Sequence, residues 1–277
     1  MSRSSASTSD GWRLLLDKPA SGAWNMAVDE VLLDGVAAGT APPTLRFYAW
    51  TPPCLSLGYF QPFDVVDIDG CRALGVEVVR RPTGGRAILH DRELTYSIAL
   101  PASVLGQDGG VLPSYYRLSL ALQDGLRRLG VPATLAPESP GSSAAHGPVC
   151  FDRPSAHEIL LHGRKLVGSA QTRRGGGLLQ HGSILIEPRI DKLLACLHRT
   201  DGSGSRGLEE GVAGLAELGV TDPGPISSAI GAAFAAGFGV GLAQVPLQPE
   251  EEEAARVLAR AKYQSARWTE RLVSAFA

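Results

Sequence analysis

Segments rich in strand-forming residues dominate the first part of this 277-residue chain, and helix-forming segments follow them. Such runs, bounded by Pro, Gly, Asn or Asp, are typical of strands. Strands with helices interspersed, followed by helices, predict an α+β fold. The expected strands are 12–16, 45–50, 54–59, 76–80, 87–90 paired with 94–100, 158–161, 165–170 and 178–186.

Helical periodicity is strongest in two places. From Trp24 onward apolar residues share one face, and the acids Asp29, Glu30 and Asp34 fall largely elsewhere. Apolar residues between 115 and 129 share another face, and the glycine and proline that follow end that helix. Two more helices are expected at about 225–238 and from about Pro249, where acids follow at the positive helix end.

No connecting segment of the sequence clearly separates the chain into two domains. Residues 137–149 are small and turn-forming and predict a mobile surface loop, and 202–207 predict a flexible link. We therefore expect a disordered tail over 1–11 and a single catalytic domain over 12–277, mainly helical from about 207.

Composition excludes several classes of protein. The net charge of -2 does not suit a nucleic-acid binder. Four scattered cysteines without a CxxC pair favour neither a disulfide scaffold nor a zinc site. The polar first ten residues lack the apolar core of a signal peptide, and the apolar stretch 229–243 is too short to span a bilayer. We expect a cytoplasmic monomer with no membrane association, metal or cofactor.

The segment 80–91, RRPTGGRAILHD, is the most unusual loop in the chain. Paired glycines let a backbone approach a ligand and present its amide groups to an oxygen-rich group. The loop is no P-loop, because GxxxxGK[ST] is missing, and no Rossmann turn, because a strand is expected to follow. Four arginines lie in or beside it, which a simple turn does not require.

Several blocks in the right order resemble the lipoate-protein ligase and octanoyltransferase family. They are NMAVDE, LRFYAWTPPCLSLGYFQ, RRPTGGRAILHDRELTYSI, CFDRPSAHEILLHGRKLVGSAQ, LLQHGSILI and KYQSARWTE, and they span nearly the whole chain. The resemblance implies one α+β domain with a mixed sheet flanked by helices, similar to the catalytic domain of biotin and lipoate-protein ligases. It also implies a protein N-octanoyltransferase that acts in lipoate biosynthesis.

Cys150 is the candidate nucleophile. It ends the 137–149 loop, where it can meet an incoming carrier, and its CFDRPS context resembles the octanoyltransferase branch. Cys54, Cys71 and Cys196 are expected to be packed as small apolar residues. A thiol with a pKa of about 8.5 needs a nearby cation or base to act as a thiolate.

Lys165 is the candidate partner of Cys150. By resemblance it matches the lysine that contacts the acyl carbonyl in the family. It could lower the pKa of Cys150, polarise the carbonyl, or help to deprotonate the acceptor lysine, and the residues do not choose among these roles.

Further site residues follow from the same blocks. The small residues Gly168, Ser169 and Ala170 would let an acyl group approach the backbone, and an oxyanion hole there is a hypothesis. Basic side chains within 80–92 and 162–174 could receive the acidic surface of acyl carrier protein. The remaining candidates for the substrate pocket are Arg81, Thr83, Gly84, Gly85, Arg86, His90, His181 and Gly182.

The leading mechanism takes octanoyl from acyl carrier protein onto Cys150 and passes it to a lysine of the glycine-cleavage H protein or of a lipoyl domain. One alternative is an ATP-dependent lipoate-protein ligase, which needs no cysteine. Arg86 stands where many ligases carry a third glycine, and this weighs modestly against it. A second alternative is an amidotransferase that passes octanoyl between lipoyl proteins, and a third is a non-catalytic protein that holds acylated carriers.

Overall fold

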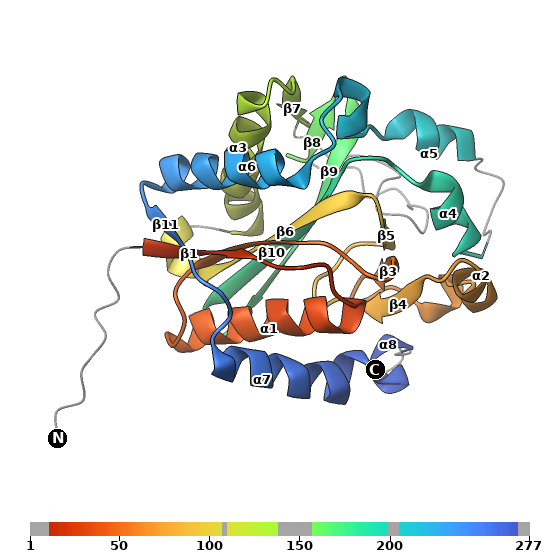
Figure 1. Cartoon of the computed structure of the whole chain (residues 1–277), viewed down its shortest axis with the longest axis horizontal. Helices are drawn as coiled ribbons and strands as arrows, with labels where there is room; N and C mark the ends of the chain where they lie inside the picture. Colours follow the sequence, from red (N-terminus) through yellow and green to blue (C-terminus); the bar gives the residue numbers. More distant parts are fainter. Residues whose placement is uncertain (1–10, 107–109, 138–156, 199–204, 271–277) are drawn as a thin grey trace.

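The computed structural model describes residues 11–106, 110–137, 157–198 and 205–270. Their strands form an eight-stranded sheet and a separate three-stranded sheet (Figure 1). In spatial order, the large sheet consists of β11 (Gly241–Gln244), β1 (Gly11–Leu16), β2 (Thr44–Tyr48), β6 (Glu93–Pro101), β10 (Gly177–Leu185), β9 (Arg164–Arg174), β8 (Ile159–Leu161) and β7 (Ala133–Leu135).

The large sheet is mixed. Strand β1 is parallel to both β2 and β11, whereas the neighbours from β2 to β7 are antiparallel. Helices lie on both faces: α3 and α6 are on one, and α1 is on the other with α7 packed on its outer side (Figure 1). This architecture confirms the predicted α+β fold. The helices are α1 (Gly22–Ala38), α2 (Ile68–Ala73), α3 (Val111–Arg128), α4 (Ile190–Ala195), α5 (Ser205–Gly211), α6 (Pro223–Phe238), α7 (Pro249–Leu258) and α8 (Ala266–Thr269), with short turns at Phe63–Val65, Ala102–Leu105, Leu215–Leu218 and Ala259–Tyr263.

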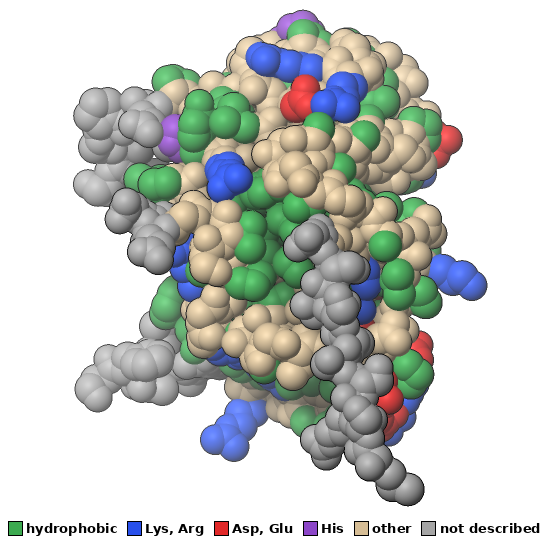
Figure 2. Space-filling view, turned by 90° about the vertical axis from the view of Figure 1, so that its left-hand side faces the viewer, with side chains coloured by type: hydrophobic (Ala, Val, Ile, Leu, Met, Phe, Trp, Pro, Cys, Tyr) green, Lys and Arg blue, Asp and Glu red, His purple; other side chains and the backbone are tan. Residues whose placement is uncertain are grey.

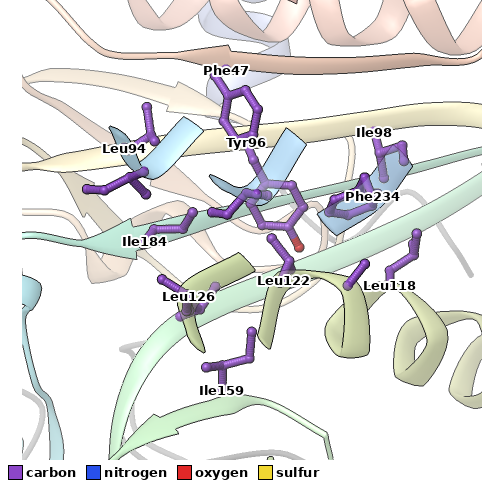
Figure 3. Close-up of a cluster of buried hydrophobic side chains, with 14 of the residues drawn as sticks. Phe47, Leu94, Tyr96, Ile98, Leu118, Leu122, Leu126, Ile159, Ile184 and Phe234 are labelled. Carbon is purple, nitrogen blue, oxygen red and sulfur yellow. The ribbon is translucent and has the colours of Figure 1, made fainter. Parts of the chain in front are cut away.

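The main core lies between the large sheet and helices α3 and α6. Tyr96 of β6 stands in its middle, fully buried, with Leu122 of α3 and Phe234 of α6 close to it (Figure 3). On the face seen from the left of Figure 1, hydrophobic side chains gather around the middle, between the upper and lower layers (Figure 2). Burial of these side chains is the largest favourable contribution to folding.

Helix α1 is buried more completely than its periodicity predicts. Asp29 and Glu30, expected largely off the apolar face, are 0% and 4% exposed. The reason is that α1 lies between the sheet and α7, so most of its circumference is covered. Both carboxylates are paired: Asp29 with Arg46, and Glu30 with Lys262.

The small sheet carries the glycine-rich loop. It consists of β4 (Glu77–Arg80), β3 (Cys54–Leu57) and β5 (Ile88–His90), with β3 parallel to β4 and antiparallel to β5. The predicted pairing of 87–90 with 94–100 is wrong, because β5 pairs with β3 and β6 with β2 and β10. The short 91–92 link carries the chain from one sheet to the other.

The hairpin predicted at His162-Gly163 is confirmed between β8 and β9, and both turn residues have positive φ. Residues 205–207, expected in a flexible link, belong to α5. The expected tail and the 137–149 loop lie outside the described residues except for positions 11 and 137, and position 11 already belongs to β1. Strands β7 and β11 were not predicted. Among the described helices, none has the length and apolar character needed to cross a bilayer.

Candidate active site

The glycine-rich loop, residues 81–86, connects β4 to β5 and packs on the turn after β3. Gly85 has a φ of 88°, and a Cβ at Gly58 would lie 1.8 Å from the carbonyl oxygen of Gly85. Both positions therefore require glycine, one for its conformation and one for the close approach. The backbone N–H of Tyr59 donates to the Thr83 carbonyl at 2.8 Å, which adds a second link between turn and loop.

Two buried arginines bond to this loop and to the turn beside it. The Arg81 guanidinium is 2% exposed and donates to the carbonyls of Gly84 and Arg86 at 2.8 and 2.7 Å. Arg80 is fully buried and also donates to backbone carbonyls, including that of Gly58 at 2.7 Å. Both guanidinium groups therefore donate to backbone carbonyls of this chain.

The prediction that both basic segments face an acidic carrier is therefore wrong for these two residues. Three exposed or half-buried arginines of these segments form ion pairs within the chain. They are Arg92 with Glu187, Arg164 with Glu217, and Arg174 with Glu30 and Asp34.

A first buried hydrogen-bond chain runs from Glu93 to Arg81. His90 Nδ1 lies 2.7 Å from Glu93 Oε1, and its Nε2 lies 2.8 Å from Ser56 Oγ. Arg81 donates to the same Ser56 hydroxyl at 3.1 Å, so that hydroxyl is available to donate to His90. The Trp50 ring stacks on His90 with centroids 4.0 Å apart.

A second chain runs from Asp29 to the glycine-rich loop. His181 Nδ1 lies 3.1 Å from Asp29 Oδ2, and its Nε2 lies 2.6 Å from Thr83 Oγ1. Burial lowers the pKa of His181, although Asp29 opposes this. Burial alone would raise the pKa of Asp29, but Arg46 and His181 outweigh it and hold the pKa below its usual value. A neutral His181 with its proton on Nδ1 therefore accepts a hydrogen bond at Nε2 from the Thr83 hydroxyl.

Lys165 lies near the start of β9, close to the His162-Gly163 turn. Its side chain is 1% exposed, and Nζ donates to Glu158 Oε1 at 2.7 Å. Glu158 is 4% exposed, so both charges of this pair are removed from bulk water. Such a pair lies where its electrostatic effect on a neighbouring group is weakly screened.

Two adjoining pockets collect the predicted residues. A narrow apolar pocket lies between the two sheets, and a wider groove lies between the glycine-rich loop, β9 and the start of α3; Ala170 lines both. The narrow pocket is lined by Met26, Tyr48, Trp50, Ser56, Arg81, Ile88, His90, Thr95, Gly168, Ala170, His181, Gly182 and Ser183. The groove is lined by Gly84, Gly85, Val111, Leu112, Tyr115, Glu158, Ser169, Ala170 and Gln171.

The sequence model of one protein family, described as the lipoyl protein ligase A/B catalytic domain, matches residues 21–234. The chain belongs to this family. Octanoyltransferase LipM of Kyrpidia tusciae is 43% identical over 94% of this chain and 98% of its own length. Octanoyltransferase LipM of Carboxydothermus hydrogenoformans is 42% identical over 93% of this chain and 97% of its own length.

Solved structures agree with the family membership. Lipoate-protein ligase A bound with ATP superimposes with a TM-score of 0.79 and 26% identity, over 94% of this chain and 98% of that one. Protein Ta0514 of T. acidophilum, a lipoate protein ligase solved with bound lipoic acid, gives a TM-score of 0.78 and 25% identity, over 95% and 99%.

Within this family fold, all but three of the predicted site residues that the structure describes line one of the two pockets. Thr83 bonds to pocket-lining His181, Arg86 supplies the carbonyl that Arg81 holds, and Lys165 bonds to groove-lining Glu158. Cys150 lies outside the described residues. Cys54, Cys71 and Cys196 are 2% exposed or less, as expected for packed thiols.

Three carboxylates of the candidate site were missed from the sequence: Asp29, Glu93 and Glu158. Each lies inside a family block, in NMAVDE, HDRELTYSI and CFDRPSAHEI respectively, so the signal was available. Asp29 meets His181 across 152 positions, whereas Glu93 and Glu158 meet His90 and Lys165 only three and seven positions away.

Proposed function

We propose that this protein is an acyltransferase that moves an octanoyl group onto a lysine of a lipoyl-carrying protein. The observation that carries the proposal is a buried Lys165–Glu158 pair at the groove that adjoins an apolar pocket. An acyl group needs an apolar pocket for its chain and a polar site for its carbonyl, and the two pockets meet at Ala170. The octanoyltransferase names of relatives 42–43% identical over nearly the whole chain support the same reaction.

The narrow pocket is the proposed place of the acyl chain. Its open volume of about 10 Å³ holds no more than a water molecule, so its side chains must move apart when the chain enters. Met26, Tyr48, Trp50 and Ile88 give it apolar walls. His90 and His181 border it with both ring nitrogens engaged in hydrogen bonds, so neither ring presents an unsatisfied donor to a hydrocarbon. This removes the main cost of placing an apolar chain beside polar side chains.

The carbonyl of the acyl group is proposed to lie in the groove. Strand β8 pairs with β9 only as far as Val167, whereas β10 continues to pair with β9 up to Arg174. Among the described strands, the edge of β9 beyond Val167 therefore has no neighbour on the side of β8. Backbone N–H groups on that edge, near Ser169 and Ala170, are the proposed donors to a developing oxyanion.

The reaction proceeds in two transfers. In the first, the proposed nucleophile Cys150 attacks the octanoyl thioester, its S–C bond forms, and the carrier's C–S bond breaks to release the carrier thiol. In the second, a lysine amine attacks the new thioester, the amide C–N bond forms, and Cys150 leaves as a thiol after taking up the amine proton. One thioester replaces another in the first step, so no ATP is needed.

Lys165 is the proposed cation for this chemistry. It could hold Cys150 as a thiolate, polarise the carbonyl, or assist deprotonation of the acceptor amine. Octanoyl-acyl carrier protein is the proposed donor, and the glycine-cleavage H protein or a lipoyl domain the proposed acceptor. Residues 12–277 are proposed to act together as one catalytic domain.

A second candidate function is ATP-dependent lipoate ligation, which the likeness to lipoate-protein ligase A bound with ATP favours. That reaction activates a free acid as its adenylate and does not require Cys150. The two functions therefore differ in whether they need ATP and in whether they need Cys150.

The test is intact-protein mass spectrometry after the protein is mixed with octanoyl-acyl carrier protein without ATP. The wild type is expected to gain a hydroxylamine-labile octanoyl adduct, and Cys150→Ala none. Cys54→Ala is the matched control and is expected to keep the adduct. Octanoylation that demands ATP and survives Cys150→Ala would instead establish the ligase.

A further inference from the structure

The C-terminal segment, defined as residues 249–270, lies beyond the part of the chain that the family model matches, which ends at 234. It runs back across the molecule and packs on α1. Glu251 at its start forms a two-bond ion pair with Arg13 of β1, at 2.6 and 2.8 Å. Near its end, Lys262 and Tyr263 both donate to Glu30 of α1. The segment is thus anchored to two elements of the catalytic fold.

The end of this segment bonds directly to Arg80, the residue before the glycine-rich loop. Arg80 donates through Nε and Nη2 to the Thr269 carbonyl, at 3.1 and 2.8 Å. In return, Trp268 Nε1 donates to the Arg80 carbonyl at 2.9 Å. Three hydrogen bonds therefore join residue 80 to residues 268–269, across about 190 positions of sequence.

The same guanidinium also holds the turn after β3. Its Nη1 donates to the carbonyls of Gly58 and Gln61 at 2.7 and 2.6 Å. Because Arg80 is fully buried, each of these bonds is made away from bulk water, where a lost bond costs more than at the surface. The Trp268 ring also contacts Tyr59 in this turn, with centroids 5.7 Å apart.

The turn and Arg80 together determine where the glycine-rich loop can lie. Gly58 touches the Gly85 carbonyl, and the Tyr59 amide donates to the Thr83 carbonyl. On the other side, Arg81 follows Arg80 directly and holds the Gly84 carbonyl. A shift of residues 268–269 would reach the loop by both routes, through Arg80 and through the turn.

We propose that the C-terminal segment is a positioning element of the acyl-transfer site, which acts through Trp268, the Thr269 carbonyl and Arg80 on the glycine-rich loop. It touches no substrate itself. The proposal rests on the proposed function for its catalytic consequence, but its structural content concerns the loop alone and is measurable without any reaction.

The test uses Trp268→Phe, which keeps an aromatic ring and removes the indole N–H, and Arg80→Lys, which keeps the charge and removes most of the donors. Thr269→Ala is the matched control, because it deletes the side chain and keeps the carbonyl that Arg80 uses. Amide hydrogen exchange is measured over 58–61 and 81–86. Loss of one buried bond is expected to speed exchange there by about tenfold, with the control exchanging like the wild type.

Octanoyl transfer is measured on the same proteins. We expect kcat to fall in both variants. The thermal unfolding midpoint of Trp268→Phe should stay close to that of the control, whereas Arg80→Lys, which loses several buried bonds, should also unfold at a lower temperature. Loop exchange equal to that of the control, or lost protection that spreads evenly into β10, would overturn the proposal. A wild type that transfers no octanoyl group would refute the proposed function, and the exchange measurement would still decide the role of the segment.

Discussion

Lys165 Nζ and Glu158 Oε1 lie 2.7 Å apart, with both side chains almost completely buried. Glu158 directly precedes β8, and Lys165 is the second residue of β9, the strand that pairs with β8. The His162-Gly163 turn brings them together. A lysine expected at the acyl carbonyl is therefore held by a carboxylate on its own hairpin.

Glu158→Gln should destabilise the protein and impair transfer. The amide keeps the shape of the carboxylate but leaves Lys165 without its negative partner, and breaking a buried pair in this way costs about 3–5 kcal/mol. Urea unfolding measures the change. Asp69→Asn, which breaks the exposed pair of Asp69 with Arg72, is the control and should leave the free energy of unfolding nearly unchanged. Equal effects of the two substitutions would contradict the role assigned to the buried pair.

Brief alkylation of the native protein with iodoacetamide should modify Cys150 and spare the other three cysteines. Cys54, Cys71 and Cys196 are 2% exposed or less, and burial raises the pKa of Cys54 well above its usual value. A buried, protonated thiol reacts slowly because the thiolate is the nucleophile. Peptide mass spectrometry locates the label, and unfolded protein gives the reference rate for each thiol. Labelling of Cys54 at its unfolded rate would show that this region opens readily.

The periodicity of residues and the family blocks were enough to predict most strands, the β8–β9 hairpin and the α+β class. They failed where a contact spans the chain. Glu30 was expected off the apolar face because its partners, Lys262 and Tyr263, lie more than 230 positions away. Local patterning carries no information about such pairs.

In the candidate site, too, local patterns were predicted and contacts between distant residues were not. The glycine-rich loop and Lys165 are visible in sequence because unusual residues stand side by side. The two buried carboxylate–histidine chains are not. Asp29 meets His181 only when helix α1 packs on the large sheet, and the His90–Glu93 pair gains its Ser56 partner only when β3 pairs with β5. The prediction that the arginines face a carrier failed for Arg80 and Arg81 for a related reason. A charged residue is usually expected at the surface, whereas these two donate to backbone carbonyls inside the fold.

Gly182→Ala should narrow the site and lower stability. A Cβ at this position would lie 2.5 Å from Ser169 Oγ, 2.6 Å from Tyr96 Cε1 and 2.8 Å from the Gly168 carbonyl oxygen. Overpacking of this kind costs about 1–3 kcal/mol. Gly241→Ala in β11 is the matched control, since a Cβ there meets nothing within 4 Å. Gly182→Ala should show a lower unfolding temperature by calorimetry and slower octanoyl transfer than Gly241→Ala. A Gly182→Ala protein that is fully active and equally stable would show that β9 and β10 move apart at little cost.

Stability should fall as the pH drops below about 6.5, and His181 should account for part of that fall. Burial lowers the pKa of His181 in the folded protein, with Asp29 opposing it. The unfolded histidine, with a pKa of about 6.5, then binds protons more readily than the folded one. By linkage, the contribution to stability is complete above 6.5 and is lost as the pH falls towards the lowered pKa.

Asp29 contributes in a different window. Its folded pKa lies below the usual value, so its stabilising effect is lost only in stronger acid, below about pH 4. Between pH 7.5 and 5 the comparison therefore isolates the histidine. Urea unfolding of His181→Gln should show a smaller loss of stability over that range than the wild type, whereas His198→Gln, at an exposed histidine, should follow the wild type. Parallel losses in all three proteins would mean that the pKa of His181 is the same in the folded and unfolded states, which would contradict the effect assigned to its burial.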